Sequence, residues 1–210
     1  MADWVTISSL GTAGGTLVLA LATFGSVRSA NRAARVAERS LRLGQRPVLI
    51  PSREDDPLER VRFGDDVYLE VPGHGAAIEL VNDNVYMAIA LRNGGSGLAV
   101  LLGWRAEVSE RTTSAAPDPD EFRRQQRDLY IPAGYTGFWQ GAIRDREDPF
   151  HESVRAAAQS GARVQVDLLY GDQEGGQRSI ARFGISPQPH VEGVRADVVR
   201  YWNVDDPDPR

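Results

Sequence analysis

Residues 85–108 read VYMAIALRNGGSGLAVLLGWRAEV, and this stretch decides the fold class. Every second residue from Val85 to Leu91 is large and apolar, which is typical of a half-buried β-strand. The run NGGSG at 93–97 has the composition of a hairpin turn. A second alternation follows, and its predicted inward residues are Leu98, Val100, Leu102, Trp104, Ala106 and Val108.

The same alternation recurs towards the C-terminus, at 136–143, 164–170, 181–185 and 194–203, and a shorter one precedes it at 67–71. Two short helices interrupt the strands. One is predicted at Asp118, which precedes a proline, and one after Asp148, ending at Gly161. No strand–helix–strand repeat is present, so the pattern predicts a mainly β chain with an antiparallel, immunoglobulin-like β-sandwich.

Residues 4–27, WVTISSLGTAGGTLVLALATFGSV, contain no charged side chain. At a rise of ~1.5 Å per residue, a helix of this length crosses the ~30 Å apolar core of a bilayer. Asp3 precedes the run and arginines follow it, which predicts a single-pass protein of the inner (cytoplasmic) membrane. Its N-terminus would lie outside and its C-terminal domain in the cytoplasm. The alternatives are a buried core helix and an amphipathic surface helix.

Five arginines continue the helix at spacings of four and three residues, which places them on one face. They would contact anionic lipid headgroups or a partner, or they would only fix the topology. The helix is expected to end at Gly44. The five are Arg28, Arg32, Arg35, Arg39 and Arg42.

Gly11 and Gly15 lie four residues apart in the apolar run. Small side chains at this spacing allow two membrane helices to approach closely, which predicts self-association through the transmembrane helix. The alternative is that glycine is merely tolerated in a single span.

Charge divides the chain into unlike parts. Residues 28–46 carry six arginines and one glutamate, a net charge of +5, whereas the chain as a whole carries −5. With Asp3 counted separately, residues 47–210 carry −9, which argues against nucleic acid as a partner. The expected divisions are an anchor at 1–27, a basic juxtamembrane helix at 28–46, the sandwich at 47–204 and an acidic disordered tail at 205–210.

Two sequence segments resemble those of a known group of proteins. They are QRPVL at 45–49 and LRNGGSGLA at 91–99. With the apolar and arginine-bearing helices before them, they resemble a diffuse group of small bacterial membrane-anchored proteins of unknown function. The resemblance implies the immunoglobulin-like sandwich and no catalytic residues.

No motif in the chain specifies a reaction. The chain has no cysteine, and its histidines, His74, His151 and His190, lack the spacing of a zinc site. We therefore expect no cofactor, no metal and no enzymatic activity. An alternative that stays open is a cation held by acidic loop residues, which are Asp65, Asp66, Asp83, Asp172 and Glu174.

One candidate surface combines aromatic and arginine side chains, the residue types favoured in binding hot spots. It comprises Tyr135, Trp139, Arg144 and Arg146. The sequence thus predicts a membrane-tethered interaction or scaffold module that presents an acidic sandwich to an unknown protein partner at the cytoplasmic face. The alternative is an extracytoplasmic ligand-binding or hydrolytic sandwich with an acidic loop site.

Overall fold

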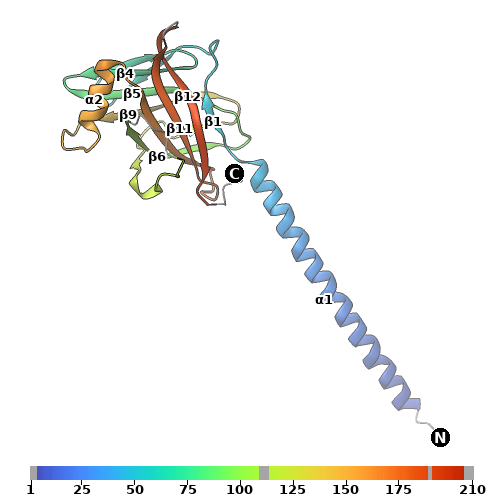
Figure 1. Cartoon of the computed structure of the whole chain (residues 1–210). Coiled ribbons are helices and arrows are strands. Elements are labelled where there is room, and N and C mark those ends of the chain that lie inside the picture. The colour runs from blue at the N-terminus through green and yellow to red at the C-terminus, as the bar shows by residue number, and fades with distance from the viewer. Residues whose placement is uncertain (1–3, 109–113, 189–190, 206–210) are drawn as a thin grey trace. The chain divides into compact units, whose positions relative to one another are not determined.

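The computed structural model describes residues 4–108, 114–188 and 191–205. Two compact units make up the chain, Met1–Gly44 and Gln45–Arg210 (Figure 1), and each is described by itself. His190 and residues 206–210 of the predicted acidic tail lie outside the described residues.

The first unit is a single helix, α1 (Trp4–Gly44), which continues from the apolar run into the arginine-bearing segment as expected. Its side chains from residue 14 to residue 41 are exposed. The large apolar ones are Leu17, Val18, Leu19, Leu21, Phe24, Val27, Val36 and Leu41.

The predicted membrane anchor is corrected by the structure. In the part of the chain that it describes, no helix is both long enough and apolar enough to cross a bilayer. Thr16 and Thr23 interrupt the apolar half of α1 together with glycines, and Arg28 then ends the uncharged stretch. The assignment to the inner membrane as a single-pass protein is therefore wrong. The topology that depended on it, with the N-terminus outside and the C-terminal domain in the cytoplasm, is not supported either.

The second unit, which we call the β domain, contains all the strands. Its regular elements are β1 (Leu49–Pro51), β2 (Glu59–Arg62), β3 (Tyr68–Val71), β4 (Gly75–Val81), β5 (Asn84–Asn93), β6 (Ala99–Glu107), the 3-10 helix η1 (Pro119–Glu121), β7 (Arg123–Arg124), β8 (Tyr130–Ile131), β9 (Thr136–Ile143), α2 (His151–Ser160), β10 (Val164–Gly171), β11 (Ser179–Gln188) and β12 (Val191–Asn203).

Ten strands join in one antiparallel sheet, and β2 and β3 form a separate hairpin. The sheet runs in the order β9-β5-β4-β12-β11-β10-β6-β7, with β1 beside β5 and β8 beside β6. The mainly β, antiparallel class with two α-helices is thereby confirmed. The immunoglobulin-like arrangement is not confirmed, because these ten strands belong to one sheet rather than to two packed sheets.

The main core lies on one face of this sheet. Strand β5 contributes every second residue from Val85 to Leu91, as predicted, and β10 contributes Val164, Val166, Leu168 and Tyr170. Helix α2 covers part of this core with Val154 and Ala157 and ends at Gly161, whose φ of 68° suits glycine.

The opposite face of β5 is buried too. Tyr86, Ala88 and Ala90 lie under the β2–β3 hairpin, whose Val61, Phe63, Leu69 and Val71 form a second core with them. The Phe63 and Tyr86 rings meet edge to face, with centroids 5.0 Å apart. A strand read as half-buried is therefore buried on both faces.

Strand β6 departs from the predicted face assignment. A register shift against β10 lies where Leu169 pairs with Gly103 and Tyr170 pairs with Leu101, so Leu102 has no partner there. This bulge reverses the faces, because an extra residue shifts a period of two by one. Ala99 and Leu101 consequently join Trp104 and Ala106 in the main core, whereas Leu102 packs on the other side of the sheet.

The glycine-rich turn after β5 is not a hairpin, since β5 and β6 do not pair with each other in the described ladders. The segment before β1 crosses this turn so closely that a Cβ on Gly97 would lie 1.7 Å from the carbonyl oxygen of Gln45. Asn93 fixes the crossing, because its Oδ1 accepts from the Val48 N–H at 3.2 Å. The segments 45–49 and 91–99, which carry the resemblance noted in the sequence, thus contact each other.

Candidate functional site

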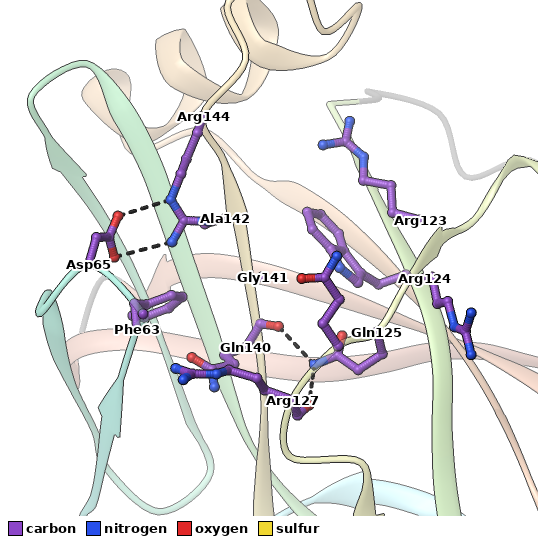
Figure 2. Close-up of a pocket in the computed structure, with 13 residues that line it drawn as sticks. Phe63, Asp65, Arg123, Arg124, Gln125, Arg127, Gln140, Gly141, Ala142 and Arg144 are labelled. Atoms are coloured by element: carbon purple, nitrogen blue, oxygen red, sulfur yellow. Dashed lines mark hydrogen bonds and ion pairs between the residues drawn. The ribbon is translucent and has the colours of Figure 1, made fainter.

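The two ends of the sheet approach each other at a boundary that we call the seam, where β9 lies beside β6 and residues 123–128. Side chains rather than a β-ladder close it. The Trp104 and Trp139 rings meet edge to face across it, with centroids 5.3 Å apart. A cleft of about 500 Å³ opens there (Figure 2), and we call it the seam cleft.

Four arginines line the seam cleft, against one carboxylate, that of Asp65. Arg123 and Arg124 form β7, Arg127 follows in the next loop, and Arg144 comes directly after β9. These side chains belong to a domain whose net charge is strongly negative. The cleft therefore concentrates positive charge on an otherwise acidic surface.

Two of the four arginines have carboxylate partners. Arg144 donates to Asp65, with Nε 2.9 Å from Oδ2, and Arg123 pairs with Asp148. The Arg144 guanidinium and the hydroxyl of Tyr86, which also donates to Asp65, lower the pKa of Asp65 to about 2. Arg123 also lies over the Trp104 ring, 5.0 Å from its centroid. These two arginines are held in place.

The other two arginines, Arg124 and Arg127, form no ion pair within the part of the chain that the structure describes. Both are exposed. A guanidinium presents five N–H donors in a planar fork that matches carboxylate and phosphate groups. These two side chains are accordingly available to an anionic ligand.

Two buried glutamines lie between the arginines. The Gln125 Nε2 group donates to the carbonyl oxygens of Gln140, at 3.2 Å, and Arg127, at 2.9 Å. Gln140 in turn donates through Nε2 to Asp128. The Oε1 atoms of both glutamines are buried without a partner among the described residues. A buried acceptor left unsatisfied is unfavourable by ~1–3 kcal/mol, so a donor that reaches these two oxygens would be stabilising.

The floor of the seam cleft is tightly packed. A Cβ on Gly141 would lie 2.5 Å from the Trp139 ring and 3.0 Å from the Trp104 ring, so only glycine fits there without displacement. Trp139 is fully buried. The floor is thus rigid, and the arginines surround it.

The predicted aromatic and arginine surface is not brought together. Trp139, expected to be partly exposed, points into the core because β9 alternates with Trp139, Gly141 and Ile143 inward. Tyr135 is exposed, and Arg146 pairs with Asp83 at 2.9 Å rather than facing the cleft. Of the four predicted residues, only Arg144 lines the seam cleft.

The predicted residues on α1 keep their helical positions. The side chains of Arg28, Arg32, Arg35 and Arg39 are exposed, and a Cβ on Gly15 would meet no atom within 4 Å. Gly11 and the Arg42 side chain lie outside the part of the chain whose side chains are described. The predicted contacts with lipid, with a second helix or with a partner remain predictions.

The acidic loop residues do not gather into a metal site. Within the described residues, no group of three or more histidine or acidic side chains is placed to hold a metal ion. Asp66 pairs with Arg62, and Asp172 accepts from the Gly176 N–H in its own turn. His74 lies 3.6 Å from Asp197, and His151 is buried with its Nε2 3.0 Å from the Asp83 carbonyl oxygen.

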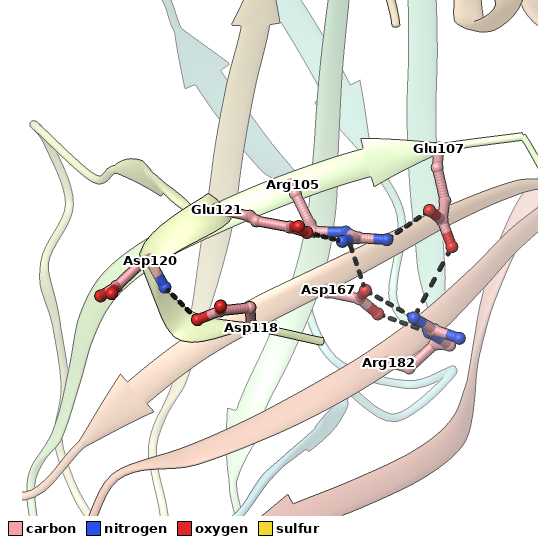
Figure 3. Close-up of polar contacts among 7 residues, drawn as sticks. All are labelled: Arg105, Glu107, Asp118, Asp120, Glu121, Asp167 and Arg182. Carbon is pink, nitrogen blue, oxygen red and sulfur yellow. Dashed lines mark hydrogen bonds and ion pairs between the residues drawn. The ribbon is translucent and has the colours of Figure 1, made fainter. Parts of the chain in front are cut away.

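A second arginine-carboxylate cluster lies on β6, β10 and β11, and we call it the buried network (Figure 3). Arg182 binds both oxygens of Asp167, with Nε at 2.6 Å and Nη2 at 2.7 Å. Arg105 pairs with Glu107 and with Glu121, the latter at 2.6 Å. Burial raises the pKa of Asp167, and the Arg182 guanidinium opposes this rise. Every charge in the network has a partner.

The cleft residues that the sequence analysis did not single out are mostly in one run, RRQQR at 123–127, and Gln140 lies apart from it on β9. The available signal was the composition of this run, which has three arginines and two glutamines within five residues and no strand alternation.

Comparison with protein-family models, with curated proteins and with solved structures finds no match for this chain.

Proposed function

We propose that the β domain is a non-catalytic binding module that takes an anionic ligand in the seam cleft. The observation that carries the proposal is the pair of arginines without ion pairs, Arg124 and Arg127, beside the two buried glutamines with unpartnered Oε1 atoms. The proposal keeps the predicted interaction role and changes the expected partner. The partner expected from the sequence was an unknown protein at an acidic surface, whereas this arginine-lined cleft fits an acidic ligand.

The negative net charge of the domain does not oppose this. At physiological ionic strength the Debye length is ~8 Å, so carboxylates elsewhere on the surface are largely screened from a ligand in the cleft. The local arginines therefore decide the sign of the interaction. A hydrogen bond to a charged group contributes ~1.5–3 kcal/mol where water is excluded, and an exposed ion pair contributes ~0–1 kcal/mol.

The geometry supports binding over acid–base catalysis. Asp65, the one carboxylate that lines the cleft, is kept ionised by Arg144 and Tyr86, and its pKa of about 2 is far from neutral pH. The hydrolytic alternative relied on acidic loops, whose Asp65, Asp66 and Asp83 are engaged by arginines. An immunoglobulin-like relation of the domain likewise remains a proposal.

The test is a calorimetric titration of the full chain with two anionic probes. They are inorganic pyrophosphate and a decapeptide of alternating aspartate and serine. We expect saturable binding of at least one probe. The double variant R124Q/R127Q should weaken it by about tenfold or more, which corresponds to ~1.4 kcal/mol or more.

The matched control is R53Q/R60Q, which removes the same charge from exposed arginines that do not line the cleft. It should leave the affinity within about twofold, because neither side chain lines the cleft and only screened, long-range electrostatics reach a ligand there. Absence of binding by both probes, or an equal loss in the two double variants, would overturn the proposal.

A further inference from the structure

The arginines of the seam cleft are spread along it rather than aimed at one point. Figure 2 shows the guanidinium groups of Arg124, Arg127 and Arg144 on separate sides of the cleft. A single phosphate bound by several arginines requires their forks to converge. The observed spacing suits a ligand that carries several negative charges at intervals.

A peptide-like group already spans the seam. The side-chain amide of Gln125 reaches across to β9 and donates to the backbone carbonyl oxygen of Gln140. A carboxamide offers the same N–H donor and C=O acceptor as a peptide unit. The edge of β9 next to the seam therefore accepts a peptide-type hydrogen bond at a position where no strand pairs with it in the described ladders.

The unpartnered acceptors have a matching requirement. The Oε1 atoms of Gln125 and Gln140 are buried acceptors that lack a hydrogen-bond donor among the described residues. A peptide backbone supplies N–H groups, whereas phosphate at neutral pH is almost entirely an acceptor.

We infer that the ligand of the seam cleft is an extended peptide segment rich in aspartate or glutamate. Its backbone lies along β9 beside the two glutamines, and its carboxylates bind Arg124 and Arg127. This inference rests on the proposed binding function and deepens it. The main-chain contacts give the segment its position, as in other cases where a peptide lies against the edge of a sheet, and the arginines select its charge.

Nucleic acid fits the cleft less well. Single strands are bound through bases that stack on exposed aromatic rings. The aromatic residues that line the cleft, Phe63 and Trp104, are both buried, and Arg123 covers the Trp104 ring.

The experiment compares four probes on the full chain by fluorescence polarisation. They are the aspartate–serine decapeptide, the same peptide with alternate backbone nitrogens methylated, pyrophosphate as a competitor, and an oligothymidylate of equal charge. The inference expects the decapeptide to bind about tenfold or more tightly than either non-peptide probe. Methylation, which removes N–H donors but no charge, should weaken binding by about tenfold.

The variants show whether binding occurs in the cleft. R124Q/R127Q should lower the affinity for the decapeptide by about tenfold or more, and R53Q/R60Q should not. Both are surface changes, and a thermal melt of each variant confirms that it is folded.

The remaining outcomes separate the two claims. If pyrophosphate or oligothymidylate binds as tightly as the decapeptide and depends on Arg124 and Arg127, the peptide inference fails and the anion-binding function stands. If methylation has no effect, the peptide inference also fails. If no probe binds, both claims fail.

Discussion

Arginines meet carboxylates in two regions of the β domain, and the two regions use the same chemistry differently. In the buried network, Arg105 and Arg182 both form ion pairs, with Asp167, Glu107 and Glu121 as their carboxylate partners. In the seam cleft, Arg144 pairs with Asp65 and Arg123 with Asp148, whereas Arg124 and Arg127 form no ion pair among the described residues. In the buried network the charges are balanced within the domain. In the seam cleft the guanidinium N–H donors of Arg124 and Arg127 can bind another molecule.

The difference shows how burial separates structural charges from functional ones. A buried charge without a partner is strongly unfavourable, so the buried Arg182 needs the Asp167 carboxylate beside it. An exposed arginine is solvated by water and needs no partner in the free protein. Changes in the network should therefore act on stability, and changes in the cleft should act on binding.

The largest effect is expected in the buried network. Arg182→Met leaves Asp167 buried without its main partner, and breaking a buried pair in this way destabilises a protein by ~3–5 kcal/mol. Urea denaturation followed by circular dichroism measures the change. The double variant D167L/R182M should regain most of the loss, because an apolar pair leaves no uncompensated charge.

The matched comparison is R124Q/R127Q in the same assay, which should change the free energy of unfolding by less than ~0.5 kcal/mol. Equal destabilisation by R182M and R124Q/R127Q would erase the distinction between the two regions.

A smaller effect is expected at the floor of the cleft. Gly141→Ala places a Cβ against the Trp139 and Trp104 rings, and overpacking of this kind destabilises by ~1–3 kcal/mol. The near-ultraviolet circular dichroism of the two tryptophans should change with it. Gly176→Ala, whose Cβ would meet no atom within 4 Å, is the control and should change neither quantity. If G141A unfolds at the same temperature as the wild type, the two tryptophan rings move aside to accept the added methyl group, and the prediction is wrong.

The smallest effect is expected at the rim, from the pair of Asp65 and Arg144. The pKa of Asp65 falls from 3.8 to about 2 on folding, so the pair stabilises above pH 3.8 and loses this contribution as the pH falls towards 2. Both side chains are more than a third exposed, and the contribution is correspondingly small.

Asp65→Asn and Arg144→Gln should each remove that component from the acid limb of the stability curve, measured by urea denaturation at successive pH values. An acid limb identical to that of the wild type in both variants would show that the pair contributes nothing.

Much of the β domain could be predicted from the sequence, because one face of most strands is apolar throughout. The bounds of β9 match the alternation at 136–143, and Ala181, Phe183 and Ile185 of β11 face inward as expected. The predicted face assignment of β6 was wrong over the first half of the strand. The bulge at Leu102 reverses the faces there, and an apolar alternation in the sequence does not reveal a bulge.

The seam cleft could not be predicted in this way. It draws on residues near 64, 104, 125 and 142, which lie together only because the two ends of the sheet meet. Alternation reports which face a side chain takes, and it carries no information about which distant strand lies opposite. Trp139 shows the same limit, because composition alone suggested a surface aromatic where the sheet requires an inward one.

Strand β12 has a consequence for how the chain is made. It pairs with β11 along most of its length and with β4 at Val194 and Arg195, and in the described sheet it alone joins the β4–β5–β9 half to the β11–β10–β6 half. It also follows every other strand in chain order. During synthesis the edge of β11 therefore stays unpaired until β12 has been made, and exposed strand edges favour aggregation. The sheet becomes continuous only with its final strand.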